Sequence, residues 1–484
     1  MNKNKTSALA RHTLALLAAA ALSACANLAP SYQTPAAPVP DRWADAPASA
    51  GAGVAATPSA AQDWAAVMLD PQLRQVIALA LEHNRDLRIA TLSIEQARAS
   101  YRIQAADQWP TVNAQAGASA SRTPAQASSS GQAQLSRSHS LQVGLTAYEI
   151  DLFGRVANLK EAALQSYLNT EAAQRSTRLS LIAEVATAWL TLSADQAQLA
   201  LARETLASQQ QSLNRIVQSQ RLGGSSALTV AQAQSTVESA RLGVASYEAQ
   251  LKQDRNALEL LLGTALPAAL EPPAQSAGTP AAASLSLPPA GLPSEVLRSR
   301  PDVLAAEHLL QAANANLGAA RAARFPTISL TAAAGTASTH LSDLFKGGAW
   351  SFAPSLSLPL LDGGASQATV ESAQATLQLQ LATYEKTVQT AFREVADALA
   401  ARSTLDQRLQ AQQALVASYQ RALQLSQARY EAGADSYLTV LDAQRSLFSA
   451  QQSLVSLRLA EQGNRITLFK VLGGAWTTAA AAAG

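Results

Sequence analysis

Three side chains near the C-terminus have the residue types and the spacing to form a polar site on one helix face. They are Leu438, Asp442 and Arg445. Residues at positions i, i+4 and i+7 project from the same side of an α-helix, so these three would lie together. The chemistry of such a face is electrostatic. From spacing alone, Asp442 and Arg445 indicate an ordinary exposed ion pair worth roughly a few tenths of a kcal/mol.

The sequence contains no recognisable catalytic constellation. The histidines are scattered without the spacing of metal ligands: His12, His83, His139, His308 and His340. No phosphate-binding loop, dinucleotide fingerprint, zinc-protease motif or serine-hydrolase motif occurs. We therefore expect no enzymatic activity, no metal site and no cofactor.

Composition limits the partners as well. Hydrophobic residues make up 48% of the chain, charged residues 14%, and the formal net charge is +2. No block of Lys and Arg follows the first residues, so the phosphate-neutralising surface that nucleic-acid binding needs is missing from the sequence. Long stretches rich in Ala, Gln, Ser and Leu favour extended helices.

The N-terminus has the pattern of an export signal that ends in a modifiable cysteine. A basic start precedes an apolar run from Leu14 to Leu22, shorter than the roughly 20 residues of a membrane-spanning helix. The run ends at Leu22-Ser23-Ala24-Cys25, which resembles the lipobox of bacterial lipoproteins. We expect Cys25 to carry a covalent lipid; an ordinary signal peptide with an incidental cysteine is the alternative. Ala26, in place of the aspartate typical of inner-membrane retention, implies the outer membrane.

The sequence contains two copies of one pattern. The segment from Gly223 to Val230 reappears from Gly433 to Val440. Each copy predicts a helical stretch (about 70–108 and 301–324), a strand pair and a very long helical stretch interrupted once at a glycine. The implied segments are a signal peptide (1–24), a lipid-anchored tether (25–62), repeat 1 (63–263), a connecting segment (264–293), repeat 2 (294–474) and a C-terminal tail (475–484).

The predicted strands alternate between apolar and small polar residues. The alternating segments are 111–121, 139–149, 327–334 and 350–360. In the second of these, Leu141, Val143, Leu145 and Ala147 are expected on the apolar face. Such alternation suits strands with lipid on one side and water on the other, although a soluble antiparallel sheet with one buried face gives the same pattern.

Four membrane-crossing strands cannot form a closed barrel, because the smallest membrane barrels have about eight. Their free edges would leave backbone groups unpaired in lipid, at a cost of several kcal/mol each. A chain with only four such strands must therefore take the remaining strands from identical copies. Three chains would supply twelve strands.

Five blocks of sequence carry a resemblance to a known family. They are Leu292 to Val303 (LPSEVLRSRPDV), Ala319 to Leu330 (AARAARFPTISL), Trp350 to Gly364 (WSFAPSLSLPLLDGG), Tyr148 to Arg155 (YEIDLFGR) and Tyr437 to Arg445 (YLTVLDAQR). Together they resemble the TolC-type outer-membrane factor family, specifically the lipoprotein branch (OprM/NodT-like) of resistance-nodulation-division efflux systems. The resemblance covers nearly the whole chain after Cys25.

The resemblance implies a mixed α and β fold with an internal two-fold repeat. A homotrimer would form a twelve-stranded outer-membrane β-barrel, four strands per chain, continued by a twelve-helix periplasmic α-barrel. A periplasmic membrane-fusion adaptor would dock near the tip turns at Gly223 and Gly433, with an inner-membrane pump of the resistance-nodulation-division type. The implied function is passive conduction of substrates to the exterior. The alternatives are an exit duct for type I protein secretion and a lipid-anchored helical scaffold without a pore.

The resemblance also changes the interpretation of the C-terminal polar face. In OprM-like channels the residues that match Leu438, Asp442 and Arg445 constrict the periplasmic tip, so a periplasmic gate is implied here. Three Asp442 carboxylates about 6 Å apart at an effective dielectric near 20 would repel by ~3 kcal/mol per pair. Such a ring would favour bound cations or a shared proton and oppose anions. The matching positions of the first copy are Gln232 and Ser235, so only one helix pair carries the charge.

Overall fold

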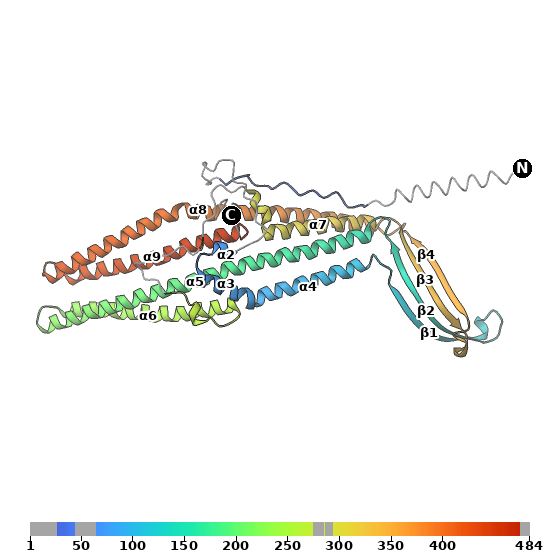
Figure 1. Ribbon diagram of the computed structural model, residues 1–484, viewed down its shortest axis with the longest axis horizontal. Helices are drawn as coiled ribbons and strands as arrows, with labels where there is room; N and C mark the ends of the chain where they lie inside the picture. The colour runs from blue at the N-terminus through green and yellow to red at the C-terminus, as the bar shows by residue number, and fades with distance from the viewer. Residues whose placement is uncertain (1–26, 44–63, 274–284, 286–293, 475–484) are drawn as a thin grey trace. The chain divides into compact units, whose positions relative to one another are not determined.

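The computed structural model describes residues 27–43, 64–273, 285 and 294–474 (Figure 1). The expected signal peptide, Cys25 and the C-terminal tail lie outside the described residues, as do parts of the tether and of the connecting segment. The chain divides into two compact units. The sheet unit comprises described residues 27–36, 93–171 and 305–384; the hairpin unit comprises 37–43, 64–92, 172–273, 285, 294–304 and 385–474.

The secondary structure repeats along the chain. The first copy contains α2 (Trp64–Val67), α3 (Pro71–His83), α4 (Arg85–Ala106), β1 (Val112–Thr123), η1 (Ala125–Ala127), β2 (Gln134–Ile150), α5 (Arg155–Arg221), α6 (Ala227–Leu262) and η2 (Ala268–Leu270). The second contains η3 (Ser294–Ser299), α7 (Pro301–Ala322), β3 (Thr327–Ser338), η4 (Leu341–Asp343), β4 (Gly348–Ser357), α8 (Ala365–Glu431) and α9 (Tyr437–Val471). Helices α5 and α8 are each 67 residues long, and α4 and α7 are each 22. Equal lengths mean that both copies encode the same succession of elements.

The first helical stretch differs from the expectation, because it is broken at Asn84. This residue is buried and has an extended backbone, with φ −62° and ψ 133°. Its Oδ1 accepts the backbone N–H of Leu87 at 2.8 Å, which caps α4, and its Nδ2 donates to the Leu261 carbonyl at 2.8 Å. Asparagine competes with helical hydrogen bonds in this way, so α3 and α4 replace the single predicted helix.

The four strands form one antiparallel sheet in the order β1-β2-β3-β4, which leaves β1 and β4 at its edges. The pairs that share the apolar face include Val112–Leu145, Ala332–Phe352 and Ala334–Trp350. The strands fall close to the predicted segments, although β2 begins earlier and β4 ends at Ser357.

One residue of β2 departs from the predicted alternation. A register shift lies between Leu145 and Tyr148, and Ala147 is the extra residue, with φ 52°. Its N–H donates to Thr331 Oγ1 at 3.1 Å. The bulge reverses the alternation, so Tyr148 and not Ala147 pairs with Leu330 on the apolar face. The placement of Ala147 on that face was therefore wrong.

Close strand contacts explain two of the sheet's glycines. A Cβ added at Gly335 would lie 2.1 Å from the Leu141 carbonyl oxygen, and one added at Gly144 would lie 2.3 Å from that of Ala332. No larger residue fits without displacing the neighbouring backbone. These glycines therefore allow the close approach between β2 and β3.

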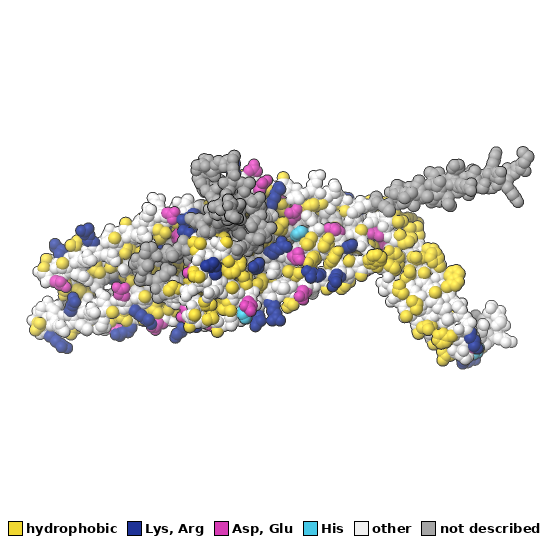
Figure 2. Space-filling model, viewed as in Figure 1, with side chains coloured by type: hydrophobic (Ala, Val, Ile, Leu, Met, Phe, Trp, Pro, Cys, Tyr) yellow, Lys and Arg dark blue, Asp and Glu magenta, His cyan; other side chains and the backbone are white. Residues whose placement is uncertain are grey.

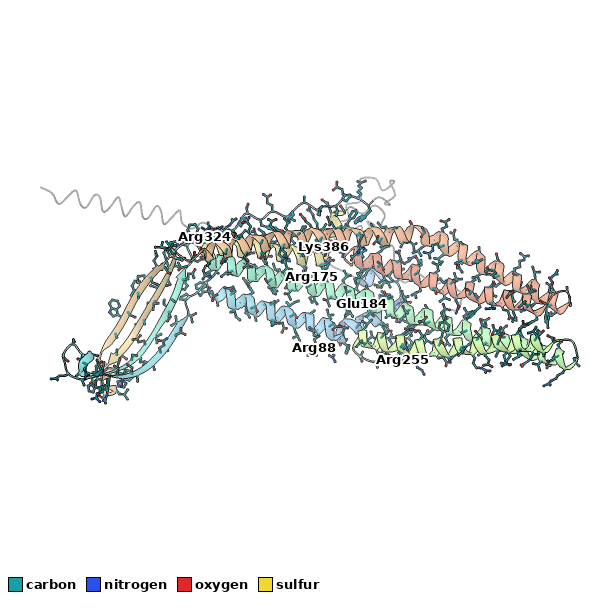
Figure 3. The ribbon with its side chains drawn as sticks, turned by 180° about the vertical axis from the view of Figure 1, so that it is seen from behind. Arg88, Arg175, Glu184, Arg255, Arg324 and Lys386 are labelled. Carbon is teal, nitrogen blue, oxygen red and sulfur yellow. The ribbon has the colours of Figure 1, made fainter. Side chains whose placement is uncertain are left out.

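Apolar side chains of the sheet are exposed in the described chain. Strands β1 and β4 are exposed along nearly their whole length, and Trp350 and Phe352 are 81% and 62% exposed. Figure 2 shows hydrophobic side chains gathered over the strands, while charged ones lie mainly over the helices. The charged residues labelled in Figure 3 likewise lie on helices or, for Arg324, in the turn before β3. Within the described chain, nearly every residue of β1 and β4 is therefore exposed on both faces of the sheet.

The hairpin unit has a continuous apolar core. Helices α3, α5, α6 and α9 contribute Ile77, Trp189, Leu258 and Phe469, all at most 2% exposed. The Trp189 Nε1–H also donates to the Leu270 carbonyl at 3.1 Å. A second cluster near the helix turns packs α9 against α5 and α6; it comprises Leu213, Ile216, Ala233, Val237, Tyr437, Val440 and Leu441. None of the helices in the described part of the chain combines the length and apolar composition that a membrane span requires.

The described part of the tether is held by specific contacts. Within the sheet unit, Tyr32 Oη and Thr34 Oγ1 donate to Glu307 Oε1 at 3.2 and 3.0 Å. Burial and the charge of Glu307 raise the pKa of Tyr32 to about 12. Within the hairpin unit, Trp43 stacks on Phe392 with ring centroids 5.3 Å apart. Residues 27–43 are therefore attached to helices along their length.

Candidate functional site

The two long helix hairpins end in turns of the same geometry. Gly223 and Gly433 have φ values of 82° and 73°. The residue after Gly223 donates its N–H to the Ser219 carbonyl at 2.8 Å, and Ala434 donates to the Arg429 carbonyl at 2.9 Å. These bonds close the last helical turn in the manner of a Schellman motif, whose left-handed residue favours glycine. The structure therefore places both predicted tip glycines at helix ends.

The turn at Gly433 carries more charge than the turn at Gly223. Arg429 donates from Nε and Nη2 to the Asp435 carboxylate at 2.6 and 3.0 Å. The hydrogen bond and charge of Arg429 lower the pKa of Asp435. At the first turn, Ser225 Oγ donates to Ser219 Oγ at 3.0 Å instead. The second tip is thus stabilised by an exposed bidentate ion pair that the first lacks.

The predicted gate residues lie on an exposed face of α9. Leu438, Asp442 and Arg445 are all exposed, whereas Val440 and Leu441 pack against α5 and α6. The buried side of α9 therefore directs the three predicted residues away from the core. No hydrogen bond or ion pair joins Asp442 to Arg445 in the described chain, so the isolated pair considered from spacing is not formed.

Arg445 reaches a small groove beside the first hairpin. The groove has a volume of about 360 Å³ and is lined by residues of α5, α6 and α9, including Gln209, Ser235 and Phe448. Ser235 is the position in the first copy that matches Arg445, so folding brings these two counterparts to one groove. The Gln209 Oε1 atom is buried there without a hydrogen-bond partner among the described residues.

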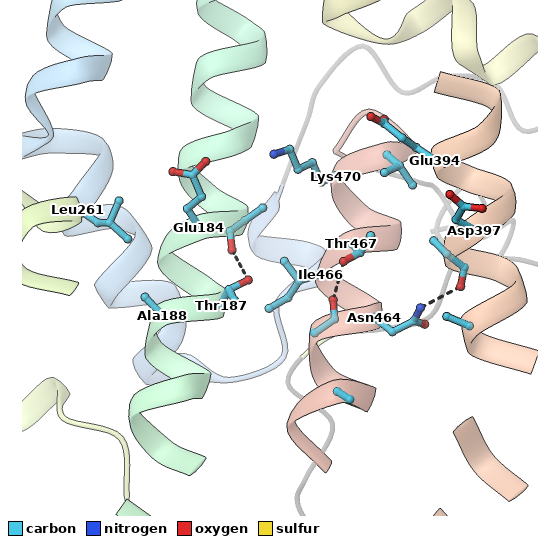
Figure 4. Close-up of a pocket in the computed structure, with 16 residues that line it drawn as sticks. Glu184, Thr187, Ala188, Leu261, Glu394, Asp397, Asn464, Ile466, Thr467 and Lys470 are labelled. Carbon is cyan, nitrogen blue, oxygen red and sulfur yellow. Dashed lines mark hydrogen bonds between the residues drawn. The ribbon is translucent and has the colours of Figure 1, made fainter. Parts of the chain in front are cut away.

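A larger groove lies between α5, α8 and α9 within the hairpin unit (Figure 4). It measures about 960 Å³, and its lining includes Glu184, Glu394, Asp397 and Lys470. Glu184 and Glu394 occupy matching positions of the two copies. Figure 4 shows Lys470 extending between Glu184 on one side and Glu394 on the other. The remaining lining is largely alanine and other small or apolar residues, so the charged lining is three carboxylates and one ammonium group and is acidic on balance.

Arg300 has a structural role that the sequence did not predict. Its side chain is 9% exposed and donates to Asp302 Oδ2 at 2.6 Å, Glu394 Oε2 at 2.8 Å and the Val471 carbonyl at 2.9 Å. It thereby joins the start of α7 to α8 and α9. Arg300 lies in the block from Leu292 to Val303 that carries the family resemblance, but two of its partners, Glu394 and Val471, are distant in the chain. Arg300 is therefore a structural cation.

The described residues offer no metal centre. No group of three or more His, Cys, Asp or Glu side chains among them is arranged to hold a metal ion. The charged groups of the hairpin unit instead pair with one another or face outward. The charged residues that folding brings together in the hairpin unit thus lie in ion pairs, in the two grooves and at the helix tips.

Comparison with known proteins gives consistent matches. The family model described as "Outer membrane efflux protein" matches residues 76–264 and 292–474. The toluene efflux pump outer membrane protein TtgC of Pseudomonas putida is 45% identical over 470 residues, covering 97% of this chain and 96% of the relative. The outer membrane protein OprJ of Pseudomonas aeruginosa is 44% identical over 464 residues, covering 96% and 95%.

Solved structures match over nearly the whole chain. A crystal structure of a membrane protein from Pseudomonas aeruginosa matches with a TM-score of 0.85 and 42% identity, covering 92% of this chain and 100% of that one. The open state of the Neisseria gonorrhoeae MtrE outer membrane channel matches with a TM-score of 0.81 and 35% identity, covering 93% and 98%. Similarity of fold and sequence therefore extends through both copies.

Proposed function

Because the chain belongs to the outer membrane efflux protein family, we propose that it is the exit channel of a tripartite efflux pump. Three copies form a twelve-stranded barrel in the outer membrane, four strands from each, continued by a twelve-helix periplasmic α-barrel. A periplasmic membrane-fusion adaptor and an inner-membrane pump of the resistance-nodulation-division type deliver the substrate. The channel conducts it passively, because the energy is spent at the pump.

The observation that carries this proposal is the open, uncovered sheet. Its edges, β1 and β4, have no strand partner within the described chain. A hydrophobic edge strand without a partner is an unstable arrangement in water and a costly one in lipid. Pairing β4 of one copy with β1 of the next satisfies both edges, and closure requires more than one copy.

The apolar face of the sheet has the height of a membrane band. Along β3 it runs from Ile328, paired with Leu356, to Thr336, paired with Leu141. Eight residues at about 3.3 Å each span about 26 Å along the strand. With a tilt of about 40° this becomes about 20 Å, close to the roughly 25 Å band of outer-membrane barrels. The opposite face carries small polar residues suited to water, such as Ser329 and Ser355, whose hydroxyl groups are 2.8 Å apart.

The channel proposal is tested with the purified full chain. Reconstituted in planar bilayers, it should give discrete conductance steps, and unheated samples should migrate on gels as a compact oligomer that heating converts to monomer. A monomeric protein without β signal in circular dichroism, or one that never conducts, would refute the proposal.

The exposed face of α9 supports a gate at the periplasmic tip. Three copies of Asp442 would line the constriction, with Leu438 and Arg445 on either side. Asp442→Ala should raise single-channel conductance and reduce selectivity for cations, because it removes three negative charges from the narrowest point. Gln232→Ala, at the matching position of the first copy, is the control and should leave both unchanged. Unchanged conductance in the Asp442→Ala channel would remove the gate from the proposal.

Adaptor docking is proposed at the hairpin tips marked by Gly223 and Gly433. The apolar side chain beside the first tip, Leu222, is 88% exposed, and Leu228 on the other arm is also exposed. Leu222→Ser should therefore lower efflux in cells while leaving conductance in bilayers intact. Loss of both efflux and conductance would indicate a damaged channel. Unchanged efflux and unchanged conductance would exclude docking at this tip.

The covalent lipid on Cys25 remains a proposal drawn from the lipobox-like segment. Cells supplied with labelled palmitate should incorporate it into the wild-type chain and not into the Cys25→Ser variant. Equal labelling of the two would show that the acylated residue is not Cys25.

A further inference from the structure

The apolar face of the sheet ends in a basic surface near the turns that connect β1 to β2 and β3 to β4. Successive pairs on this face are Ala116–Leu141, Ala118–His139, Ala120–Arg137 and Arg122–Leu135. Opposed residues of antiparallel strands project to the same side, so Arg122 and Arg137 share the side of Leu141. We call these two arginines the basic rim. Figure 2 shows Lys or Arg and His side chains gathered at this end of the strands.

The basic rim is exceptional within the sheet. The charged or titratable residues of the four strands are Arg122, Arg137, His139, Tyr148 and Glu149, and β3 and β4 contain none. Of these, Glu149 pairs with Arg155 at the opposite end of β2. The two arginines therefore interrupt an otherwise uncharged surface at one end only.

Both guanidinium groups are exposed and lack a protein anion. Neither Arg122 nor Arg137 makes a hydrogen bond or ion pair with another described residue, whereas nearby Lys346 pairs with Asp343 at 2.7 Å. Arg122 and Arg137 occupy diagonal positions on adjacent strands, a spacing at which long side chains meet. Two like charges at that spacing favour an anion bound between them.

The depth of the basic rim indicates what kind of anion it meets. Arg137 lies four residues beyond Leu141 along β2, about 13 Å along the strand and about 10 Å in height at a 40° tilt. The headgroup region of a bilayer is about 5–8 Å thick on each side of the hydrocarbon core. Arginine side chains at such a boundary extend toward the interface. The apolar band of about 20 Å is about 5 Å shorter than the roughly 25 Å band of outer-membrane barrels, so the boundary lies about 2–3 Å beyond Leu141. Arg137 then stands about 7–8 Å above the boundary, at the level of lipid headgroups. Arg122 lies two residues further out, about 5 Å higher, and its long side chain reaches back to that level.

We propose that Arg122 and Arg137 bind the phosphate groups of an anionic, phosphate-bearing glycolipid in the leaflet at this end of the barrel. Arginine suits this ligand, because its planar guanidinium forms two parallel hydrogen bonds to phosphate oxygens. The apolar band beside it, with Leu141 and Trp350, contacts the acyl chains of the same lipid. A trimer presents three such sites. The inference rests on the proposed function, since it requires the apolar face to lie in a membrane.

The test uses the full-length channel purified in non-ionic detergent, with diphosphoryl lipid A as the probe and native mass spectrometry as the readout. The wild-type protein should bind diphosphoryl lipid A more tightly than phosphatidylcholine. Arg122→Gln combined with Arg137→Gln should weaken lipid A binding about 30-fold, from the usual contribution of two basic residues at an anionic surface. The matched control combines Arg221→Gln with Arg408→Gln, which removes the same charge from exposed helical positions and should leave binding unchanged.

Two outcomes overturn the inference. One is binding of lipid A by the double variant at the wild-type affinity. The other is equal wild-type affinity for lipid A and phosphatidylcholine. Conductance is measured on the same preparations, so that the two proposals are separated. Normal conductance with either of these binding results overturns only the lipid site. Absence of conductance and of a β-rich trimer overturns the channel as well.

Discussion

Glu461 of α9 lies at the centre of the most buried ion network among the described residues of the hairpin unit, and we expect its substitution to destabilise α9 locally. The carboxylate is 8% exposed and accepts from Arg402 Nη1 at 2.5 Å and Arg465 Nε at 2.6 Å. Arg465 also donates to the Leu285 carbonyl at 2.8 Å. The network thus ties α8 to α9, the helix that carries the proposed gate.

Glu461→Gln keeps the shape of the side chain and removes its charge. Removing one partner of a buried ion pair typically costs about 3–5 kcal/mol, because the other charge stays desolvated. The low end applies here, since Arg402 keeps a second partner in the exposed Asp406, 3.1 Å away. We therefore expect a loss of about 3 kcal/mol in the local stability of α9. That corresponds to an increase of about 100-fold in the population of the opened state.

Hydrogen exchange followed by mass spectrometry measures the population of the opened state directly, on peptides around residue 461. The control is Glu248→Gln, which makes the same chemical change in the Arg203–Glu248 pair, where the side chains are 59% and 47% exposed. Exposed pairs contribute at most about 1 kcal/mol, so exchange near Glu248 should rise less than about 5-fold. Exchange around residue 461 that stays within about 5-fold of wild type would refute the assignment of this network as a structural element.

Two further predictions concern pH and packing. Burial is the main cause that raises the pKa of Asp195 from 3.8 to about 7, and the hydrogen bond and charge of Asp254 add to it. Between about pH 4 and 7 the folded state therefore keeps a proton on Asp195 that the unfolded chain has lost. The free energy of unfolding should therefore fall as pH rises through that window. Asp195→Asn should raise the unfolding temperature relative to wild type at pH 8 but not at pH 4. Equal pH profiles of the two proteins in thermal scans would contradict the role of Asp195. Gly335→Ala should prevent assembly of the proposed heat-modifiable trimer, because the added Cβ would lie 2.1 Å from a backbone oxygen. In the control, Gly117→Ala, the nearest atom is a serine hydroxyl at 3.3 Å, so the trimer should form. Trimers of both variants on unheated gels would refute the close-contact argument.

The sequence alone determined the succession of elements, because periodicity is a local property. Alternation with a period of two marked the strands, and glycines after long helical runs marked the two tips. The repeated blocks indicated two copies of one pattern, and the resemblance indicated the family that the comparisons show. Each of these features can be read from neighbours within a few residues or from direct similarity.

Only the tertiary structure decided which distant residues meet. The bulge at Ala147 depends on pairing with β3, and the break at Asn84 depends on a carbonyl of α6. The partners of Arg300 include Val471, far along the chain. Likewise, Arg122 and Arg137 share a face only because of the register between β1 and β2. Such contacts depend on how the chain folds back on itself, and local propensity carries no information about that choice.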